Sequence, residues 1–188
     1  MRLDCGPCVI RSWRLEDAAS LARHANDRRV SINLRDRFPF PYSLEDAKGY
    51  LAFVTSEQPE TSFALEVNGE AVGGIGLILH GDVERVSAEI GYWLGVAFWG
   101  RGIVPAALRE LTRHAFAHHP LTRIYALPFT TNAASIRVLE KVGYVREGIQ
   151  RRAVIKDGQV LDLAIYAIYD DTAPGLLGAV PRGPGSGP

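Results

Sequence analysis

One segment that reads as a strand, a glycine turn and a helix constrains the fold of this chain most strongly. Residues 86–94 are typical of a central strand, and residues 103–118 place apolar side chains at helical spacing. Gly100 and Gly102 lie between them, and Pro105 falls in the first helical turn, where a missing N–H costs nothing. Free N–H groups and the positive end of the helix dipole favour an anion there. The sequence therefore predicts an anion site at this turn.

The glycine turn differs from the two common nucleotide-binding fingerprints. No Lys-Ser or Lys-Thr pair follows the glycines, as a P-loop requires, and no third glycine completes a dinucleotide fingerprint. A second helix is predicted to begin at Asn132, whose side chain can both donate and accept hydrogen bonds. The two elements together suit a ligand that carries a pyrophosphate and an amide-bearing arm.

Length, composition and charge narrow the class of protein. A chain of 188 residues suits one domain, and 47% hydrophobic with 22% charged residues is a globular composition. Lys and Arg number 21, as do Asp and Glu, so no basic field attracts nucleic acid. With no leader pattern and no apolar run of about eighteen residues, we expect a cytoplasmic protein without a membrane partner.

We expect three parts along the chain. Residues 1–7 are predicted to be an N-terminal extension and residues 8–170 the folded domain. Residues 171–188 are rich in Gly and Pro and are predicted to form a flexible tail, because they cannot bury apolar surface.

Periodicity predicts the order βααβββαβαββ within the domain. The predicted strands are 9–13, 62–67, 71–79, 86–94, 123–129, 151–155 and 160–168, and the main predicted helices begin at 16, 44, 103 and 133. Asn68-Gly69 and Asp157-Gly158 are hairpin turns. Residues 43–46 have the spacing of a capping box. The helix that follows is predicted to bury one face, made of Leu44, Ala47, Leu51 and Val54.

Four short motifs occur in a fixed order. They are Glu-Ile-Gly-Tyr-Trp-Leu at 89–94, Trp-Gly-Arg-Gly at 99–102, Asn-Ala-Ala-Ser at 132–135 and Glu-Lys-Val-Gly-Tyr at 140–144. Together they resemble the GNAT N-acetyltransferases, most closely the RimJ/RimL-like branch, over roughly residues 8–169. The resemblance implies an α/β (α+β) GNAT fold, with a mixed central sheet flanked by helices on both faces. The element order predicted from periodicity agrees with this fold independently of the motifs.

The resemblance also implies an activity. It implies direct transfer of an acetyl group from acetyl-CoA, the cosubstrate, to a primary amine, with no metal. A protein N-terminal α-amine is slightly favoured over a small-molecule amine, because an α-amine titrates near pH 8 and a lysine near 10.4. A homodimer is also expected, since two-fold dimers are the most common soluble oligomers.

The resemblance assigns the cofactor contacts to three segments. The residues implied are Leu94, Gly95, Val96, Gly100, Arg101, Gly102, Ile103, Val104, Asn132 and Ser135. Many relatives have Gln or Arg in place of Trp99, and Gly or Ala in place of Val104. Because backbone N–H groups do the binding, both changes preserve the donors. Asn132 can alternatively act only as a helix N-cap.

Two residues are implied in proton transfer. Glu89, in the middle of a strand beside the cofactor segment, is the candidate base, with a structural ion pair as the alternative. Many GNAT enzymes protonate the leaving thiolate with a Tyr seven residues after the Asn, but here Leu139 holds that position. The resemblance places Ser135 near the sulfur instead, where a hydroxyl can donate a hydrogen bond to the thiolate. Tyr144 is a second candidate acid, or a core residue.

Aromatic and histidine clusters have competing interpretations. Phe38, Phe40 and Tyr42 are predicted to line the acceptor-binding site, or to form a lid over the core. His114 and His118 have the i, i+4 spacing of helical zinc ligands, but no acidic residue accompanies them in register. We therefore predict no metal site.

Cys5-Gly-Pro-Cys8 matches the active-site tetrapeptide of thioredoxin-like oxidoreductases. In those proteins the first Cys starts a helix after a buried strand, whereas residues 9–13 here read as a strand. A frayed N-terminal turn is the preferred interpretation, and a thioredoxin-like redox protein is an alternative function. A catalytically silent acyl-CoA-binding module is another alternative, because the usual acid is missing. A third alternative is a structural dimer partner that keeps the fold but has lost the catalytic activity.

Overall fold

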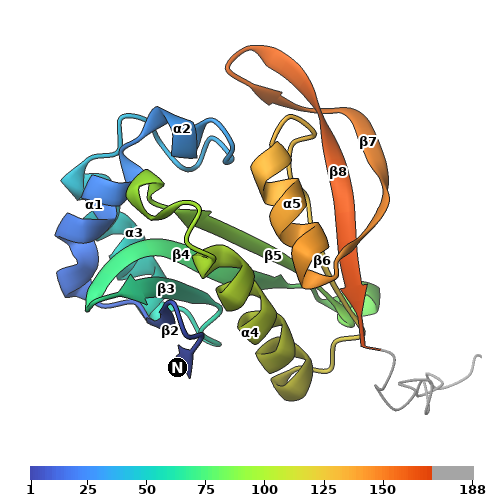
Figure 1. Cartoon of the computed structure of the whole chain (residues 1–188), viewed down its shortest axis with the longest axis horizontal. Helices are drawn as coiled ribbons and strands as arrows, with labels where there is room; N and C mark the ends of the chain where they lie inside the picture. The colour runs from blue at the N-terminus through green and yellow to red at the C-terminus, as the bar shows by residue number, and fades with distance from the viewer. Residues whose placement is uncertain (171–188) are drawn as a thin grey trace, which may run out of the picture.

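Eight strands form one mixed sheet in the order β1-β2-β3-β4-β5-β6-β8-β7 (Figure 1). The computed structural model describes residues 1–170, so the tail predicted at 171–188 lies outside the described residues. The strands are β1 (Arg2–Asp4), β2 (Val9–Ser12), β3 (Ser62–Val67), β4 (Glu70–Leu79), β5 (Ser87–Leu94), β6 (Arg123–Ala126), β7 (Val145–Lys156) and β8 (Gln159–Tyr169). Of these neighbours only β5 and β6 run parallel.

Helices cover both faces of the sheet, as predicted (Figure 1). They are α1 (Ala18–Ala25), α2 (Arg28–Ser31), α3 (Leu44–Ser56), α4 (Ile103–His118) and α5 (Ala133–Val142), with short 3₁₀ turns η1 (Leu15–Asp17), η2 (Asp82–Glu84) and η3 (Val96–Phe98). On one face α1 and α3 bury Leu21 and Leu51, and on the other α4 and α5 bury Leu108 and Leu139. The two layers confirm the GNAT fold implied by the sequence.

Several local signals form as predicted. Ser43 Oγ accepts the N–H of Asp46 at 3.1 Å, and the Asp46 carboxylate accepts the N–H of Ser43 at 2.8 Å, which completes the capping box of α3. Gly143 ends α5 with φ 104°, in the left-handed region. The prediction that Leu44 is buried was wrong: its side chain is 45% exposed, because α3 packs on the core only from Ala47 onward.

Residues 2–4 form a strand of the sheet and residues 5–8 form the turn that follows it, so the segment is not the frayed turn that was predicted. Strand β1 pairs with β2 in the register Leu3–Ile10, and the Cys5 N–H donates to Cys8 O at 2.9 Å. The Cys-Gly-Pro-Cys turn therefore joins two strands. It lacks the strand-to-helix setting of a thioredoxin-like site.

The boundaries of the predicted strands are correct to within one residue, except in β6 and β7, which differ by more. Strand β6 ends at Ala126 instead of residue 129, because Pro128 has no N–H to continue the ladder and Phe129 makes only an isolated bridge to Leu163. Strands β7 and β8 form a longer hairpin than predicted. Most of β7 is exposed on both sides and carries two register shifts, so its sequence shows no clear alternation.

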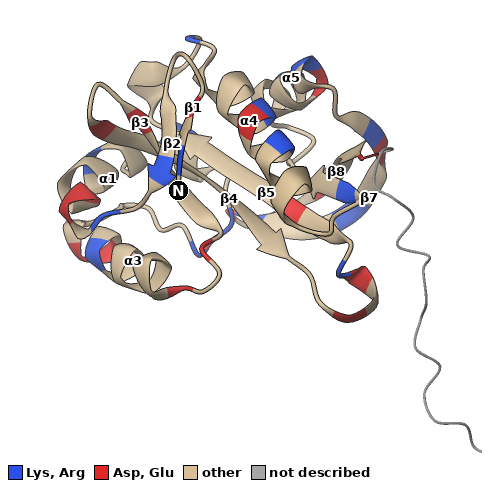
Figure 2. Ribbon diagram, turned by 90° about the horizontal axis from the view of Figure 1, so that it is seen from below, with Lys and Arg blue, Asp and Glu red and all other residues tan. Residues whose placement is uncertain are grey.

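The surface of residues 1–170 mixes both signs of charge. Basic and acidic residues are interspersed over helices, strands and loops in the view of Figure 2. No helix in this part of the chain is both long and apolar enough to cross a membrane.

Candidate functional site

The parallel pair β5–β6 opens partway along its length. Its register runs from Ser87–Arg123 to Glu89–Tyr125. Beyond Glu89, β5 continues to Leu94 in register with β4 alone, and β6 ends. The sheet therefore contains an opening, bordered by the second half of β5.

Backbone groups of β5 point into this opening. Val86 O accepts the N–H of Thr122 on the β6 side at 2.8 Å, and the Gly95 N–H donates to Val72 O on the β4 side at 2.8 Å. Because successive residues of a strand face opposite edges, Tyr92 directs its N–H and C=O groups towards the opening, and Leu94 directs its N–H group there, while Leu94 O accepts the Trp99 indole N–H. An extended amide-bearing ligand can complete the ladder here.

The predicted anion turn lies at the start of α4. Gly100 and Gly102 both have φ 74°, a backbone conformation that side-chain-bearing residues rarely adopt. Because Ala106 is the first residue whose N–H donates back into the helix, the N–H groups of Gly102, Ile103 and Val104 have no intrahelical acceptor. A Cβ added at Gly100 or Gly102 would meet no protein atom within 4 Å. The turn therefore presents open donors to an anion.

Two side chains of the turn hold it in place through hydrogen bonds to backbone carbonyls. The Trp99 indole N–H donates to Leu94 O at 2.8 Å, which ties the turn to the end of β5. Arg101 donates to Ala97 O at 2.7 Å, and its guanidinium lies 5.0 Å from the centre of the Phe98 ring. Trp99 thus replaces the Gln or Arg of many relatives with a structural contact. The exposed Arg101 keeps a positive charge beside the turn.

Gly95 and Val96 position the turn. The Gly95 N–H is already bonded to Val72 O, so it does not point into the opening. A Cβ at Gly95 would lie 3.0 Å from atoms of the His24 side chain, so a larger residue there would require His24 to shift. Val96 begins η3, which leads into the glycine turn. Of residues 94–96, only Leu94 directs its backbone N–H towards the opening, and its carbonyl already accepts the Trp99 indole N–H.

Asn132 and Ser135 lie on the first turn of α5. Asn132 Oδ1 caps the helix by accepting the N–H of Ser135 at 3.1 Å. Within residues 1–170 its amide Nδ2 has no hydrogen-bond partner, so it remains a donor for a ligand. The cap and the ligand contact predicted for Asn132 are therefore compatible.

Tyr92 is a site residue that the sequence did not single out. Its hydroxyl lies 2.8 Å from Ser135 Oγ and 3.4 Å from Ser135 O, so it spans from β5 to α5. Burial raises the pKa of Tyr92 to about 12, which keeps the phenol protonated and able to donate. When Tyr92 donates to Ser135 Oγ, the serine proton is free to point at another acceptor.

Tyr144 belongs to the core. It is 2% exposed, and its hydroxyl lies 2.8 Å from Thr112 Oγ1 on α4. Of the two readings of Tyr144, the structure favours the core residue.

Glu89 lies on the opposite face of β5 from Tyr92. Arg35 donates to its Oε1 at 3.1 Å, and the Glu89 side chain is 19% exposed. Tyr125 on β6 is its neighbour across the parallel pair, and burial, with a smaller contribution from the Glu89 charge, raises the pKa of that phenol. A carboxylate and a serine hydroxyl thus approach the opening from opposite faces of the sheet.

A cavity of about 230 Å³ extends from the Glu89 face. Its lining includes His80, Glu84, Ser87, Arg123, Tyr125 and Gln150. His80 Nε2 lies 2.8 Å from the Tyr125 hydroxyl, and the two rings stack at 5.7 Å. The alternation of side chains along a strand predicts that Ser87 and Glu89 share a face. The position of the cavity also depends on the register between β5 and β6, which could not be predicted from the sequence.

The loop of residues 33–42 borders the Glu89 side. Tyr42 is 6% exposed and belongs to the core, so it supports the loop and does not line the cavity. Phe38 packs on Tyr42 and, at 5.4 Å, on Trp93. Phe40 is 46% exposed, and the Arg28 guanidinium lies 5.6 Å from the centre of its ring. Phe40 is therefore the most accessible of the three predicted aromatic residues.

Ion pairs connect this side to the tip of the β7–β8 hairpin, which extends beyond α5 in Figure 1. Arg28 pairs with Asp157, and Lys156 Nζ donates to Asp36 Oδ1 at 2.8 Å. The Lys156 side chain is 6% exposed. These ion pairs thus join the hairpin tip to α2 and to the 33–42 loop.

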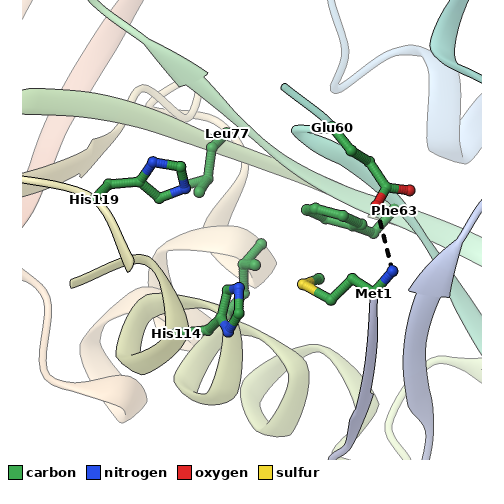
Figure 3. Close-up of a pocket in the computed structure, with 7 residues that line it drawn as sticks. Met1, Glu60, Phe63, Leu77, His114 and His119 are labelled. Atoms are coloured by element: carbon green, nitrogen blue, oxygen red, sulfur yellow. Dashed lines mark hydrogen bonds and ion pairs between the residues drawn. The ribbon is translucent and has the colours of Figure 1, made fainter. Parts of the chain in front are cut away.

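A larger cavity, of about 370 Å³, lies away from these residues (Figure 3). Met1, Glu60, Phe63, Leu77, His114 and His119 line it. His114 is eleven residues from the start of α4, about 16 Å along the helix, so this cavity lies far from the glycine turn. Within residues 1–170 no three His, Cys, Asp or Glu side chains are placed to hold a metal ion.

The chain is similar to known acetyltransferases. Residues 8–145 match the family described as the acetyltransferase (GNAT) domain. The chain is 36% identical over 101 residues to the putative ribosomal N-acetyltransferase YdaF of Bacillus subtilis (strain 168), a match that covers 54% of this chain and 55% of that protein. It therefore spans about half the length of this relative.

Two solved structures share the fold. Mycobacterium smegmatis RimJ in complex with CoA-disulfide has a TM-score of 0.75 and 28% identity, and covers 92% of this chain and 87% of its own. RimL, a ribosomal L7/L12 alpha-N-protein acetyltransferase in complex with coenzyme A, has a TM-score of 0.80 and 19% identity, and covers 91% and 99%. With the family match over residues 8–145, the chain belongs to the GNAT acetyltransferase family.

Proposed function

We propose that this protein transfers the acetyl group of acetyl-CoA directly to a primary amine. The observation that carries the proposal is the opening between β5 and β6, which has anion-binding and amide-binding groups on one side and a carboxylate on the other. The first side suits acetyl-CoA, and the second suits the amine that accepts the acetyl group.

The helix α4 and α5 side suits the donor. The free N–H groups of Gly102, Ile103 and Val104, with the Arg101 charge nearby, would hold the pyrophosphate. The backbone N–H and C=O of Tyr92 and the N–H of Leu94 would pair with the pantetheine amides. The amide of Asn132 is free to contact the same arm. RimJ, which binds a CoA-disulfide, shares this fold at 28% identity and supports the assignment.

Glu89 and Ser135, the two polar residues at the opening, would assist the two halves of the transfer. The amine nitrogen attacks the thioester carbonyl carbon, a C–N bond forms, and the C–S bond then breaks. Glu89 would take the proton that the amine loses, directly or through a water. Ser135, held by Tyr92, would donate a hydrogen bond to the departing sulfur.

We propose a protein N-terminal α-amine as the acceptor. The 230 Å³ cavity, which is lined by Tyr125 opposite Glu89, has polar walls from His80, Glu84 and Gln150, with partly exposed side chains that suit the backbone groups of a peptide. An α-amine is also partly deprotonated at neutral pH, which suits a single carboxylate base. The relative named as a putative ribosomal N-acetyltransferase supports a protein acceptor.

A comparison of amine classes tests the acceptor. Purified protein is incubated with acetyl-CoA and one of several amines, and release of the CoA thiol is measured. We expect release with a short peptide that has a free N-terminus. We expect little thiol release with the same peptide when its N-terminus is blocked and a lysine side chain supplies its only amine. Polyamines and aminoglycosides complete the set.

The outcomes separate three interpretations. Release only with lysine, polyamine or aminoglycoside would contradict the α-amine and keep the acetyltransferase. Acetyl-CoA binding with no release for any amine would favour a silent acyl-CoA-binding module instead.

Gly102→Val is expected to weaken CoA binding about tenfold, which corresponds to about 1.4 kcal/mol. The valine would occupy space where the phosphate approaches and would strain a backbone with φ 74°. Calorimetric titration of CoA measures the change. Gly158→Val is the matched control, because Gly158 has φ 75° and equally open surroundings at the β7–β8 turn. Equal affinity losses in both variants, or none in Gly102→Val, would place the pyrophosphate elsewhere.

A further inference from the structure

The two cysteines of the chain lie side by side in the β1–β2 turn. The Cys5 N–H donates to Cys8 O at 2.9 Å, and the ladder beyond them pairs Asp4 with Val9 and Leu3 with Ile10. Residues opposite each other in an antiparallel pair share a face, so both thiols lie on the face of Leu3 and Ile10, which packs towards α4.

Pairing across the turn is compatible with the Cα separation that a disulfide needs. Opposite residues of a hydrogen-bonded antiparallel pair have Cα atoms about 5.5 Å apart. Disulfides span Cα separations of about 4.4–6.8 Å. The turn between the cysteines contains Gly6, with φ 82°, and its N–H donates to Asp4 Oδ1 at 2.8 Å.

The two thiols differ in exposure and acidity. Cys8 is 4% exposed, with its sulfur 4.0 Å from Ile103 O at the start of α4, whereas Cys5 is half-buried. A hydrogen bond from the Cys8 thiol lowers the pKa of Cys5, although burial opposes this. The same hydrogen bond, together with burial, raises the pKa of Cys8. A partly exposed thiol with a lowered pKa thus lies beside a buried thiol.

We propose that Cys5 and Cys8 form a reversible dithiol site that is oxidised to an intrachain disulfide by a low-molecular-weight disulfide. Cys5 loses its proton and attacks one sulfur of the small disulfide, and one small thiolate leaves. Cys8 then loses its proton and attacks Cys5 Sγ, and the second small thiolate leaves. The protein loses two electrons, and the small disulfide becomes two thiols.

The short spacing fits a reversible site better than a structural crosslink. The bond would close a loop of only four residues, and disulfides that close short loops constrain the unfolded chain least. Strands β1 and β2 already pair without it, and the Met1 ammonium donates to Ser12 Oγ at 2.7 Å across the same hairpin. The fold therefore does not depend on the oxidised form.

Mass spectrometry of the full chain tests the site. The reduced protein is equilibrated in buffers of rising oxidised-to-reduced glutathione ratio, alkylated and digested with trypsin. Cleavage after Arg2 and Arg11 leaves both cysteines in peptide 3–11. We expect this peptide to lose two hydrogens and escape alkylation as the ratio rises, and dithiothreitol to reverse the change.

Single variants identify the attacking thiol. Cys8→Ser should accumulate a mixed glutathione disulfide at Cys5, and Cys5→Ser should leave Cys8 unmodified while the protein stays folded by circular dichroism. Two free thiols in the native protein under conditions that oxidise the urea-unfolded chain would overturn the proposal. Equal glutathione capture by the two variants would overturn the order of attack. No acetyl donor is used, so the result is independent of the proposed acetyltransfer.

Discussion

Glu89→Gln is expected to lower turnover by about a hundredfold or more and to leave acetyl-CoA affinity unchanged. The amide keeps the size of the side chain but cannot accept a proton from the attacking amine. Steady-state thiol release with the best peptide acceptor gives the turnover, and calorimetry gives the affinity.

Arg35→Gln is the control that separates a base from a structural ion pair. It removes the partner of Glu89 and keeps the carboxylate. Arg35 is 45% exposed, and exposed ion pairs contribute at most about 1 kcal/mol, so turnover should stay within a few-fold of the wild type. Equal losses in the two variants would assign Glu89 a structural role. A normal rate in Glu89→Gln would mean that the amine arrives already deprotonated.

Ser135→Ala is expected to slow turnover by about ten- to a hundredfold. It removes one hydrogen bond to a developing thiolate, and bonds to charged groups contribute about 1.5–3 kcal/mol. Acetyl-CoA affinity should change little, because the cap from Asn132 uses the backbone N–H of residue 135 and not its hydroxyl. A rate within twofold of the wild type would exclude Ser135 from proton handling.

Tyr92→Phe tests how Ser135 is positioned. The phenol holds Ser135 Oγ at 2.8 Å, so its loss should slow turnover less than the loss of the serine hydroxyl itself. The double variant should be no slower than Ser135→Ala, because both changes act on one hydrogen bond. The pKa of Tyr92 is raised to about 12, so between pH 6 and 10 the variant should alter the rate without altering its high-pH limb. Additive losses would mean that Tyr92 acts separately from Ser135.

Local sequence signals predicted those elements whose conformation depends on a few neighbouring residues. Asn68-Gly69 and Asp157-Gly158 form the predicted turns with positive φ at all four residues. Asn132 begins α5 and Gly143 ends it. The glycine turn before α4 follows from the same local rules, so the donor side of the site could be predicted closely.

Features that depend on long-range pairing could not be predicted. Strand β1 has three residues, too few to show a period, and it is fixed by pairing with β2. The contact of Tyr92 with Ser135 joins residues 43 positions apart. Arg35 and Asp36 come from a loop without periodicity, and only the folded chain brings them to Glu89 and Lys156. The acceptor side of the site is built mainly from such contacts.

Calorimetric titration of acetyl-CoA into the wild-type protein tests the central proposal most directly. A donor site at the β5–β6 opening predicts saturable binding of one acetyl-CoA per chain, weakened about tenfold by Gly102→Val and unchanged by Gly158→Val. Absence of binding at millimolar acetyl-CoA or CoA, in protein shown to be folded, would contradict it.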